Sequence, residues 1–209
     1  MKTLGLLFAF GLGASTGTVI NFDTAPLGKT PPGWIVPMAH RGGPSRWEVR
    51  KDQTAPTQPY VLAQVSNDGT NDRSPLAILD KVNLRDGEVS VRIKAVGGRE
   101  DQGGGLVWRY RDENNYYLVR ADALGRSVTV YKVENGKRTQ ILGGVKHEMP
   151  ANRWSTLKVA ARGNRFQVYV DHRRLLQGWD STFSGPGRVG LSTDADSVTY
   201  FDDFRVYPR

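Results

Sequence analysis

The stretch GGGLVWRYRDENNYYLVRAD, residues 103–122, decides the fold class of this 209-residue chain. It contains two runs in which apolar and polar side chains alternate, separated by the turn-forming residues Asp112 to Asn115. Alternation with a period of two is typical of a β-strand with one buried face, and a short polar joint between two such runs predicts a hairpin. This stretch therefore predicts two antiparallel strands.

The rest of the chain repeats the pattern. GEVSVRIKAV, residues 87–96, alternates in the same way, and Asn135-Gly136 is a dipeptide favoured in tight type I′ hairpin turns. No stretch shows a sustained apolar period of 3.6 residues with capping residues, which a helix would need. The 24 glycines and 11 prolines are typical of a chain with many turns. We therefore expect an all-β fold, an antiparallel sandwich or jelly roll, as one domain over residues 18–209.

Residues 1–17 are predicted to be a signal peptide. Met1-Lys2 gives a positively charged start, the apolar run LGLLFAFGLGA occupies residues 4–14, and small residues follow at a possible cleavage site near Ser15 or Gly17. The apolar run is shorter than the roughly 20 residues that a membrane-spanning helix needs. We therefore expect a secreted or periplasmic protein without a membrane span. The alternative is that this segment forms a buried N-terminal strand.

The net charge and the absence of cysteine exclude several classes of function. The formal net charge is +8, but the basic residues are spread along the chain, which favours a solvated and mildly basic surface. Nucleic acid is not expected as a partner, because an exported protein would not meet it. The chain has no cysteine, which excludes disulfides, a thiolate nucleophile and cysteine-ligated zinc.

Alternation divides the hairpin of residues 103–122 into two faces. We assign one face to the core between two sheets; its members are Leu106, Trp108, Tyr110, Tyr117, Val119 and Ala121. The other face carries the candidate ligand-binding residues, which are Arg109, Arg111, Arg120 and Asp122, extended on the next strand by Lys132 and Glu134. Guanidinium groups and carboxylates bind sugar hydroxyls or an acidic sugar through paired hydrogen bonds. The alternative is that these charges form cross-strand ion pairs on a solvated sheet.

Several aromatic and titratable residues are further candidates. The rings of Trp34 and Trp179 would stack on a sugar, whereas Trp47, Trp108 and Trp154 are expected in the core. His40, in the loop segment MAHRGG, is the one histidine with a candidate binding role.

Glu100 and Asp101 precede the run Gly103 to Gly105 and are candidate catalytic residues. A carboxylate pair can supply the general acid and base of glycoside cleavage. Neighbours on an extended strand point to opposite faces, so at most one of the two would reach a site. The alternative is that both belong to a polar turn. The glycine run itself is expected to mark a bulge or a close approach of two backbones.

The run from DQGGGLVWRYRDENNYYLVRAD to VTVYKVENGKR, the later WSTLKVAARGNRFQVYVD and the closing GRVGLSTDADSVTYFDDFRV together resemble concanavalin A-like jelly-roll domains. Among these the chain is most similar to LamG-like domains and to exported bacterial domains named for 3-keto-disaccharide hydrolase. The resemblance covers about residues 18–207. It implies a concanavalin A-like antiparallel jelly-roll β-sandwich. Because such folds host lectins, carbohydrate-binding modules and glycosidases, it does not select among these functions.

The resemblance has two further implications. The E-x-D-x-x-E motif of the family-16 glucanases, which share the fold, is missing from this chain. Related carbohydrate-binding sandwiches hold a structural calcium near their terminal strands, where oxygen ligands gather, and we expect Asp23 and Asp203 to bind calcium if the ion is present.

We therefore expect an exported domain that holds carbohydrate, an oligosaccharide or glycan, on one face of a sheet. A second hypothesis is a glycoside hydrolase acting on (3-keto-)disaccharides or other glycosides. A third is a non-catalytic structural protein of the cell envelope.

Overall fold

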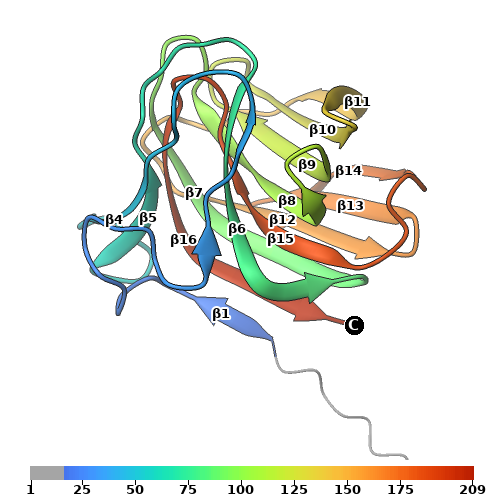
Figure 1. Ribbon diagram of the computed structural model, residues 1–209, viewed down its shortest axis with the longest axis horizontal. Helices are drawn as coiled ribbons and strands as arrows, with labels where there is room; N and C mark the ends of the chain where they lie inside the picture. Colours follow the sequence, from blue (N-terminus) through green and yellow to red (C-terminus); the bar gives the residue numbers. More distant parts are fainter. Residues whose placement is uncertain (1–16) are drawn as a thin grey trace, which may run out of the picture.

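The computed structural model describes residues 17–209, whose secondary structure consists of 16 β-strands in two antiparallel sheets (Figure 1). Residues 1–16 of the predicted signal peptide lie outside the described residues. No helix occurs between residues 17 and 209, and hence none that is long and apolar enough to cross a membrane. The predicted all-β sandwich is confirmed.

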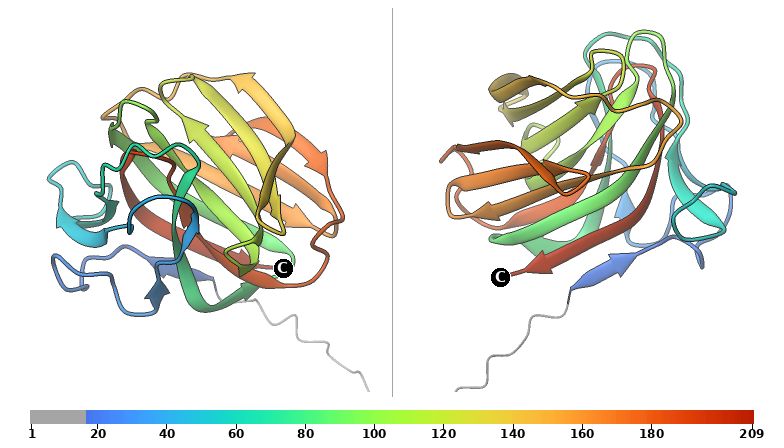
Figure 2. Two further views of the ribbon diagram at one scale, coloured as in Figure 1. Left: turned by 45° about the horizontal axis from the view of Figure 1, so that its top comes forward. Right: turned by 180° about the vertical axis from the view of Figure 1, so that it is seen from behind.

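The two sheets form two layers, as the views in Figure 2 show. Sheet A contains, in spatial order, β14 (Arg173–Trp179), β13 (Arg165–Val170), β12 (Ser155–Arg162), β7 (Gly87–Gly97), β16 (Val198–Pro208), β5 (Tyr60–Gln64) and β4 (Trp47–Lys51), with β1 (Thr18–Ile20) also paired to β16. Sheet B contains β11 (Lys137–Lys146), β10 (Ser127–Glu134), β9 (Asn115–Asp122), β8 (Gly103–Asp112), β15 (Gly187–Ser192), β6 (Arg73–Leu84) and β2 (Trp34–Ile35), with β3 (Met38–His40) also paired to β6.

The predicted hairpin is β8 and β9. Trp108 is directly opposite Tyr117, and the turn between Asp112 and Asn115 lies where the sequence places it. The next hairpin, β10 and β11, turns at Asn135 and Gly136, whose φ angles of 52° and 77° are the pair of positive values that a type I′ turn requires. The sequence therefore predicts both turns.

The main core lies between the two sheets. Within it the rings of Trp108 and Tyr117 are stacked with centroids 5.2 Å apart, and Trp47 packs on Phe201 at 5.7 Å. Trp47 and Trp108 are buried as expected. Trp154 differs: it is only half-buried, and its indole Nε1 donates to Thr54 Oγ1 at 3.2 Å.

A second apolar cluster lies on the outer face of sheet B, the face turned away from sheet A. Its members, all buried, are Ala39, Leu76, Ile78, Val107, Tyr110, Tyr116, Leu118 and Val133. The alternation of side chains puts Val107 and Leu118 on the face opposite their neighbours Trp108 and Tyr117. Both faces of sheet B therefore carry buried apolar side chains, and these hold the polar residues of its outer face in place.

A β-bulge in β8 changes which side chains share a face. The register between β8 and β9 shifts between Trp108 and Asp112, and Arg109 has a φ of 50°. Relative to β15, β8 has one extra residue between Val107 and Tyr110, because Gly190 is opposite Val107 and Arg188 is opposite Tyr110. One extra residue in a strand reverses the alternation beyond it. Tyr110 therefore joins Val107 in the outer cluster, and its predicted place beside Trp108 in the core between the sheets is wrong.

The glycine run at the start of β8 lets two backbones approach closely, as predicted. A Cβ on Gly105 would lie 2.1 Å from the carbonyl oxygen of Val119, and one on Gly104 would lie 2.9 Å from Phe201 Cζ. Real Cβ atoms do not come so near, so glycine is required where β8 packs against β9 and the core.

Candidate functional site

A polar hollow of about 230 Å³ lies at the end of the β8–β9 hairpin remote from its turn. We call it the Arg120 pocket. Its lining includes Glu100, Asp101, Arg120, Tyr131, Arg138 and Asp194. These side chains come from the segment before β8, from β9, β10 and β11, and from the segment after β15, so the folded sheet brings together residues that are far apart in the sequence.

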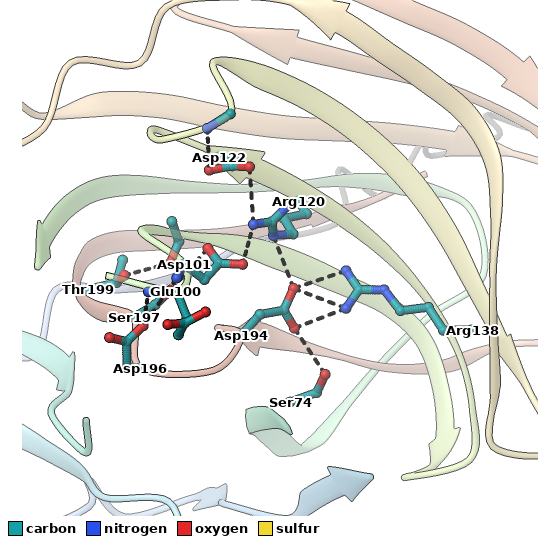
Figure 3. A network of polar contacts seen from close by, with 12 residues as sticks. Ser74, Glu100, Asp101, Arg120, Asp122, Arg138, Asp194, Asp196, Ser197 and Thr199 are labelled. Atoms are coloured by element: carbon teal, nitrogen blue, oxygen red, sulfur yellow. Dashed lines mark hydrogen bonds and ion pairs between the residues drawn. The ribbon is translucent and has the colours of Figure 1, made fainter. Parts of the chain in front are cut away.

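Arg120 is the centre of a network of charges in this pocket (Figure 3). Its Nη2 donates to Asp101 and lies 3.2 Å from Asp122 Oδ2. Its Nε lies 3.0 Å from Asp194 Oδ2. Arg138 donates to both carboxylate oxygens of Asp194, each at 3.0 Å. Two guanidinium groups and three carboxylates are thus fixed against one another.

The carboxyl group of Asp101 is nearly buried, and Ser197 Oγ donates to it at 3.1 Å. Burial raises the pKa of Asp101 to about 6 because a desolvated carboxylate is disfavoured. The positive charge of Arg120 opposes this rise, whereas the carboxylates of Asp194 and Asp122 add to it. Asp101 is therefore the group of the pocket that changes charge near neutral pH.

The segment that carries Asp101 is held by the carboxylate of Asp196. This side chain accepts hydrogen bonds from three consecutive backbone N–H groups, those of Arg99 at 2.7 Å and of Glu100 and Asp101 at 3.1 Å. Burial of Asp196 acts to raise its pKa, but these three N–H groups outweigh it and lower the pKa. Gly98 makes the preceding turn with a φ of 139°, where a Cβ would lie 1.7 Å from the carbonyl oxygen of Asp101.

Both predicted catalytic residues, Glu100 and Asp101, line the Arg120 pocket, although the sequence led us to expect at most one there. They are not equivalent. Asp101 is buried against Arg120, whereas Glu100 is exposed. The pocket therefore presents one carboxyl group of raised pKa and one in contact with solvent.

The predicted ligand face of the hairpin is only partly correct. Arg120 and Asp122 lie together as expected, but Arg109 does not join them. It sits in the bulge near the hairpin turn, is only 3% exposed, and donates to the carbonyl oxygens of Phe183 at 2.6 Å, Arg85 at 3.1 Å and Gly163. Its burial lowers its pKa. Arg109 is a structural residue, and the bulge is the reason that its side chain leaves the expected face.

Three further members of the predicted face also lie elsewhere. Arg111 is exposed near the hairpin turn, with its guanidinium 5.0 Å from the ring centroid of Phe183. Lys132 and Glu134 do share a side, with an ion pair of 3.2 Å. Lys132 is opposite Tyr117, on the face of sheet B that Arg120 does not share, and its ammonium donates to Thr182 Oγ1 at 2.8 Å. These residues do not extend the Arg120 pocket.

Trp34 and His40 are not placed for the roles predicted from the sequence. Trp34 is 7% exposed and packs on Phe22 and Phe204, so its ring belongs to the core and is not available to stack on a sugar. His40 is half-buried in β3, opposite Arg73, and does not line the Arg120 pocket. Trp179, by contrast, is 76% exposed.

The residues predicted to bind calcium have other partners. Asp23 Oδ1 accepts the backbone N–H of Tyr60 at 3.0 Å, and Asp203 lies 3.3 Å from Arg205. Within residues 17–209 no group of three or more histidine and carboxylate side chains is arranged to hold a metal ion. Calcium takes six to eight oxygen ligands, which can include backbone carbonyls and waters, and calcium binding at Asp23 and Asp203 stays a prediction.

The other half of the pocket is not predicted from the sequence. Asp194 and Arg138 complete the network around Arg120, and the ring of Tyr131 lies 4.2 Å from the Arg138 guanidinium. Asp194 stands in the segment STDADS, which looks like an ordinary polar turn. Only the pairing of β15 with β8 brings this segment to Arg120, and no local pattern encodes that pairing.

The arrangement is suited to binding a polyhydroxylated ligand. Paired guanidinium and carboxylate groups offer donors and acceptors side by side, which match adjacent hydroxyl groups. The pocket is smaller than the roughly 300–1,000 Å³ of sites for drug-sized ligands, so it is of a size for one or two sugar units.

Several solved structures have the same fold. The carbohydrate-binding module CBM66 from Bacillus subtilis matches with a TM-score of 0.66 and 23% identity, over 88% of this chain and 99% of that one. A Bacillus licheniformis beta-glucanase matches with a TM-score of 0.59 and 12% identity, over 95% and 100% of the two chains. The exoplasmic/lumenal domain of VIP36 matches with a TM-score of 0.57 and 14% identity, over 85% and 84%. At these identities the likeness concerns the fold.

Among curated proteins, the levanase of Bacillus subtilis (strain 168) is 35% identical over 113 residues, which are 53% of this chain. The matched part spans only 16% of the levanase. A family model described as the beta xylosidase C-terminal concanavalin A-like domain matches residues 63–195, nearly two thirds of the chain. These matches confirm the expected concanavalin A-like jelly roll. The chain belongs to the family of beta xylosidase C-terminal concanavalin A-like domains.

Proposed function

We propose that this domain binds carbohydrate and that the Arg120 pocket holds the end of a glycan chain. The observation that carries the proposal is the fixed network in which Arg120 faces Asp101, Asp122 and Asp194 at the wall of a small open hollow. Because ion pairs already hold these side chains, little conformational freedom is lost when a ligand binds.

The ligand that we propose to test first is levan, a fructose polymer. Two comparisons support this choice: the solved structure with a TM-score of 0.66 is a carbohydrate-binding module, and the curated relative is named as a levanase. A pocket for one or two sugar units would take a terminal fructosyl group and leave the rest of the polymer in solvent.

Isothermal titration with levan, inulin, xylan and short oligosaccharides tests this proposal. Arg138→Ala is the informative variant, because it removes one side of the pocket while Arg120 still neutralises Asp194. We expect its affinity for the bound glycan to fall at least tenfold. Arg126→Ala, which removes an exposed arginine whose one ion pair within residues 17–209 is with Glu148, is the matched control and should bind normally. Equal affinity of the two variants, or no binding of any glycan, would rule out the proposal.

A second candidate function is glycoside hydrolysis in the same pocket. It is favoured by the presence of Glu100 and Asp101 in the lining and by the raised pKa of Asp101, which suits a general acid. An enzyme would release free sugar from the bound glycan, and Asp101→Asn would retain affinity but lose turnover. A binding domain would release no product at any protein concentration. If neither binding nor turnover is found, the third hypothesis, a structural envelope protein, remains.

We also propose that the domain is exported. The support is the signal-peptide pattern of residues 1–17. Expression of the full chain, followed by N-terminal sequencing of the protein outside the cytoplasm, should give a mature start near Ser15 or Gly17. An uncleaved Met1 in a cytoplasmic product would contradict this.

A further inference from the structure

The outer face of sheet A, on the side of the sandwich remote from sheet B, carries two neighbouring hollows. The larger, of about 340 Å³, lies over β16, β7, β12 and β13, and the smaller, of about 230 Å³, lies over β7, β12, β13 and β14. Adjacent strands are about 4.8 Å apart, so the two hollows together extend across roughly 19 Å of sheet. We call this surface the sheet A face.

The register of the strands arranges the side chains of this face in rows. One row contains Arg205, Ser90, Lys158 and Tyr169. The next contains Tyr207, Glu88, Ala160, Gln167 and Gln177. A third row contains Arg162, Arg165 and Trp179. The small side chains of Ser90 and Ala160 lie in the middle of their rows, with larger charged and aromatic side chains on either side, and so the surface is hollowed across the strands.

Positive charge dominates the sheet A face. Six arginine and lysine side chains and only two carboxylates line the hollows. Both carboxylates are already neutralised: Glu88 pairs with Lys158 at 3.1 Å and with Arg209, and Asp203 pairs with Arg205 at 3.3 Å. Three arginines, Arg92, Arg162 and Arg165, have no carboxylate at ion-pair distance within residues 17–209. A large share of the net charge of +8 is therefore concentrated on one face.

Arg92 is the most constrained of these arginines. Its Nη1 donates to Thr156 Oγ1 at 3.1 Å, but its Nε is buried and has no hydrogen-bond partner within the described part of the chain. A buried donor without a partner is unfavourable. An anionic group in the larger hollow would neutralise this guanidinium and accept hydrogen bonds from those of its N–H groups that face the hollow.

Aromatic rings lie on the same face. Trp179 is 76% exposed, Tyr207 is 41% exposed, and Tyr169 lies with its ring centroid 4.4 Å from Lys158 Nζ. A tryptophan so exposed leaves a large apolar ring in water, which is unfavourable unless a ligand covers it. Gln167 and Gln177, joined by a hydrogen bond of 3.0 Å, add neutral donors and acceptors between the rings.

From these features we infer that the sheet A face is a second binding surface, for an acidic polysaccharide such as a polyuronate. A polymer with one carboxylate per sugar presents anions, hydroxyl groups and sugar-ring faces in alternation, which match the arginines, the glutamines and the aromatic rings. Nucleic acid fits less well, because its phosphates carry a charge at about every 1.7 Å of duplex and would meet the fixed carboxylates of Glu88 and Asp203. This surface is on the opposite side of the sandwich from the Arg120 pocket, and so the inference does not depend on the proposed function.

The test uses polygalacturonate and measures binding by titration at low and moderate salt. The double variant Arg92→Ala with Arg165→Ala should weaken binding at least tenfold. The matched control, Lys137→Ala with Lys146→Ala, removes the same charge from exposed positions on β11 of sheet B and should change the affinity less than twofold. Trp179→Ala should weaken binding severalfold without changing its salt dependence, because the ring carries no charge.

The outcomes separate the explanations. If the control weakens binding as much as the arginine variant, attraction is diffuse and the inference is wrong. If a DNA oligomer displaces polygalacturonate at lower concentration than polygalacturonate itself binds, the occupant is nucleic acid and the inference is wrong. Arg165→Ala alone, at an exposed position, replaces the double variant if thermal unfolding shows that loss of Arg92 destabilises the fold. Binding to the Arg120 pocket should be unchanged in all these variants.

Discussion

The Nε atom of Arg120 lies 3.0 Å from a carboxylate oxygen of Asp194, so strand β9 and the segment after β15 are joined at the Arg120 pocket. Arg138 contacts the same carboxylate from β11, and Ser74 Oγ, from β6, donates to it at 2.9 Å. Four separate parts of sheet B thus meet at one carboxylate. These contacts of Asp194 therefore stabilise the fold and also fix the pocket side chains that would bind a ligand.

Arg120→Ala should lower the free energy of unfolding by about 3–5 kcal/mol, because it leaves Asp101 and Asp122 without their cation. Urea unfolding at pH 7 measures this change. Adding Asp101→Asn to the variant should restore part of the lost free energy of unfolding, since one of the unpaired carboxylates is then removed. A single variant as stable as the original protein would show that the network contributes no stability.

The pH dependence of stability should carry the signature of Asp101. Its pKa is raised by burial to about 6, so the folded state holds a proton more tightly than the unfolded chain. The resulting stability is fully present below about pH 4 and is lost as the pH rises through about 6. Asp202, whose pKa is also raised to about 6 by burial, acts in the same direction.

We therefore expect the free energy of unfolding to fall between pH 5 and pH 7.5, with Asp101 responsible for on the order of 1 kcal/mol of the fall. Asp101→Asn should remove that part, and urea unfolding at the two pH values measures it. If the free energy of unfolding of Asp101→Asn falls with pH as steeply as that of the original protein, another group titrates. Asp202→Asn then tests whether that group is Asp202.

Arg109→Met should be destabilising without affecting ligand binding. The three backbone carbonyls that accept from its guanidinium would lose their donor inside the fold, at about 3 kcal/mol or more. Arg111→Met, an exposed neighbour, should change stability by about 0.5 kcal/mol or less. Thermal unfolding and glycan titration of both variants check this. If Arg109→Met is folded but binds the glycan more weakly, Arg109 contributes to ligand binding and the assignment as a structural residue is wrong.

Gly105→Ala should lower the free energy of unfolding by about 1–3 kcal/mol. The Cβ of the alanine would lie 2.1 Å from the carbonyl oxygen of Val119, and β8 would have to move away from β9. Gly185→Ala, where no heavy atom lies within 4 Å, is the matched control and should be nearly neutral. Denaturant midpoints of the two proteins give the comparison, and similar midpoints would mean that the strands adjust without strain.

Local sequence patterns predict much of this fold and less of its site. The alternation in residues 103–108 and the Asn135-Gly136 turn are correct, because strand faces and tight turns depend on neighbouring residues. Within β8 the prediction fails from Arg109 onward. There the backbone bulges beside Gly187, whose absent Cβ would lie 2.5 Å from the carbonyl carbon of Arg109. That contact comes from a distant segment, and nothing near Arg109 in the sequence indicates it.

The same distinction explains the candidate site. Arg120 and Asp122 share a face because they are two residues apart on one strand, and this could be predicted. Asp194 and Arg138 reach them only through strand pairing across the sheet. The ring of Trp34 lies in the core, and the sequence does not indicate this because a tryptophan near a loop looks the same whether its ring is turned inward or outward.

The last strand of the chain, β16, lies in the interior of sheet A between β7 and β5. While the protein is being synthesised, its two neighbours have no strand to bridge them until residues 198–208 have left the ribosome. Pairing between such distant segments is slow to form, and unpaired strand edges are prone to aggregate. A chain that stops short of β16 should therefore be trapped in an open form, and premature termination should yield insoluble product instead of a smaller folded domain.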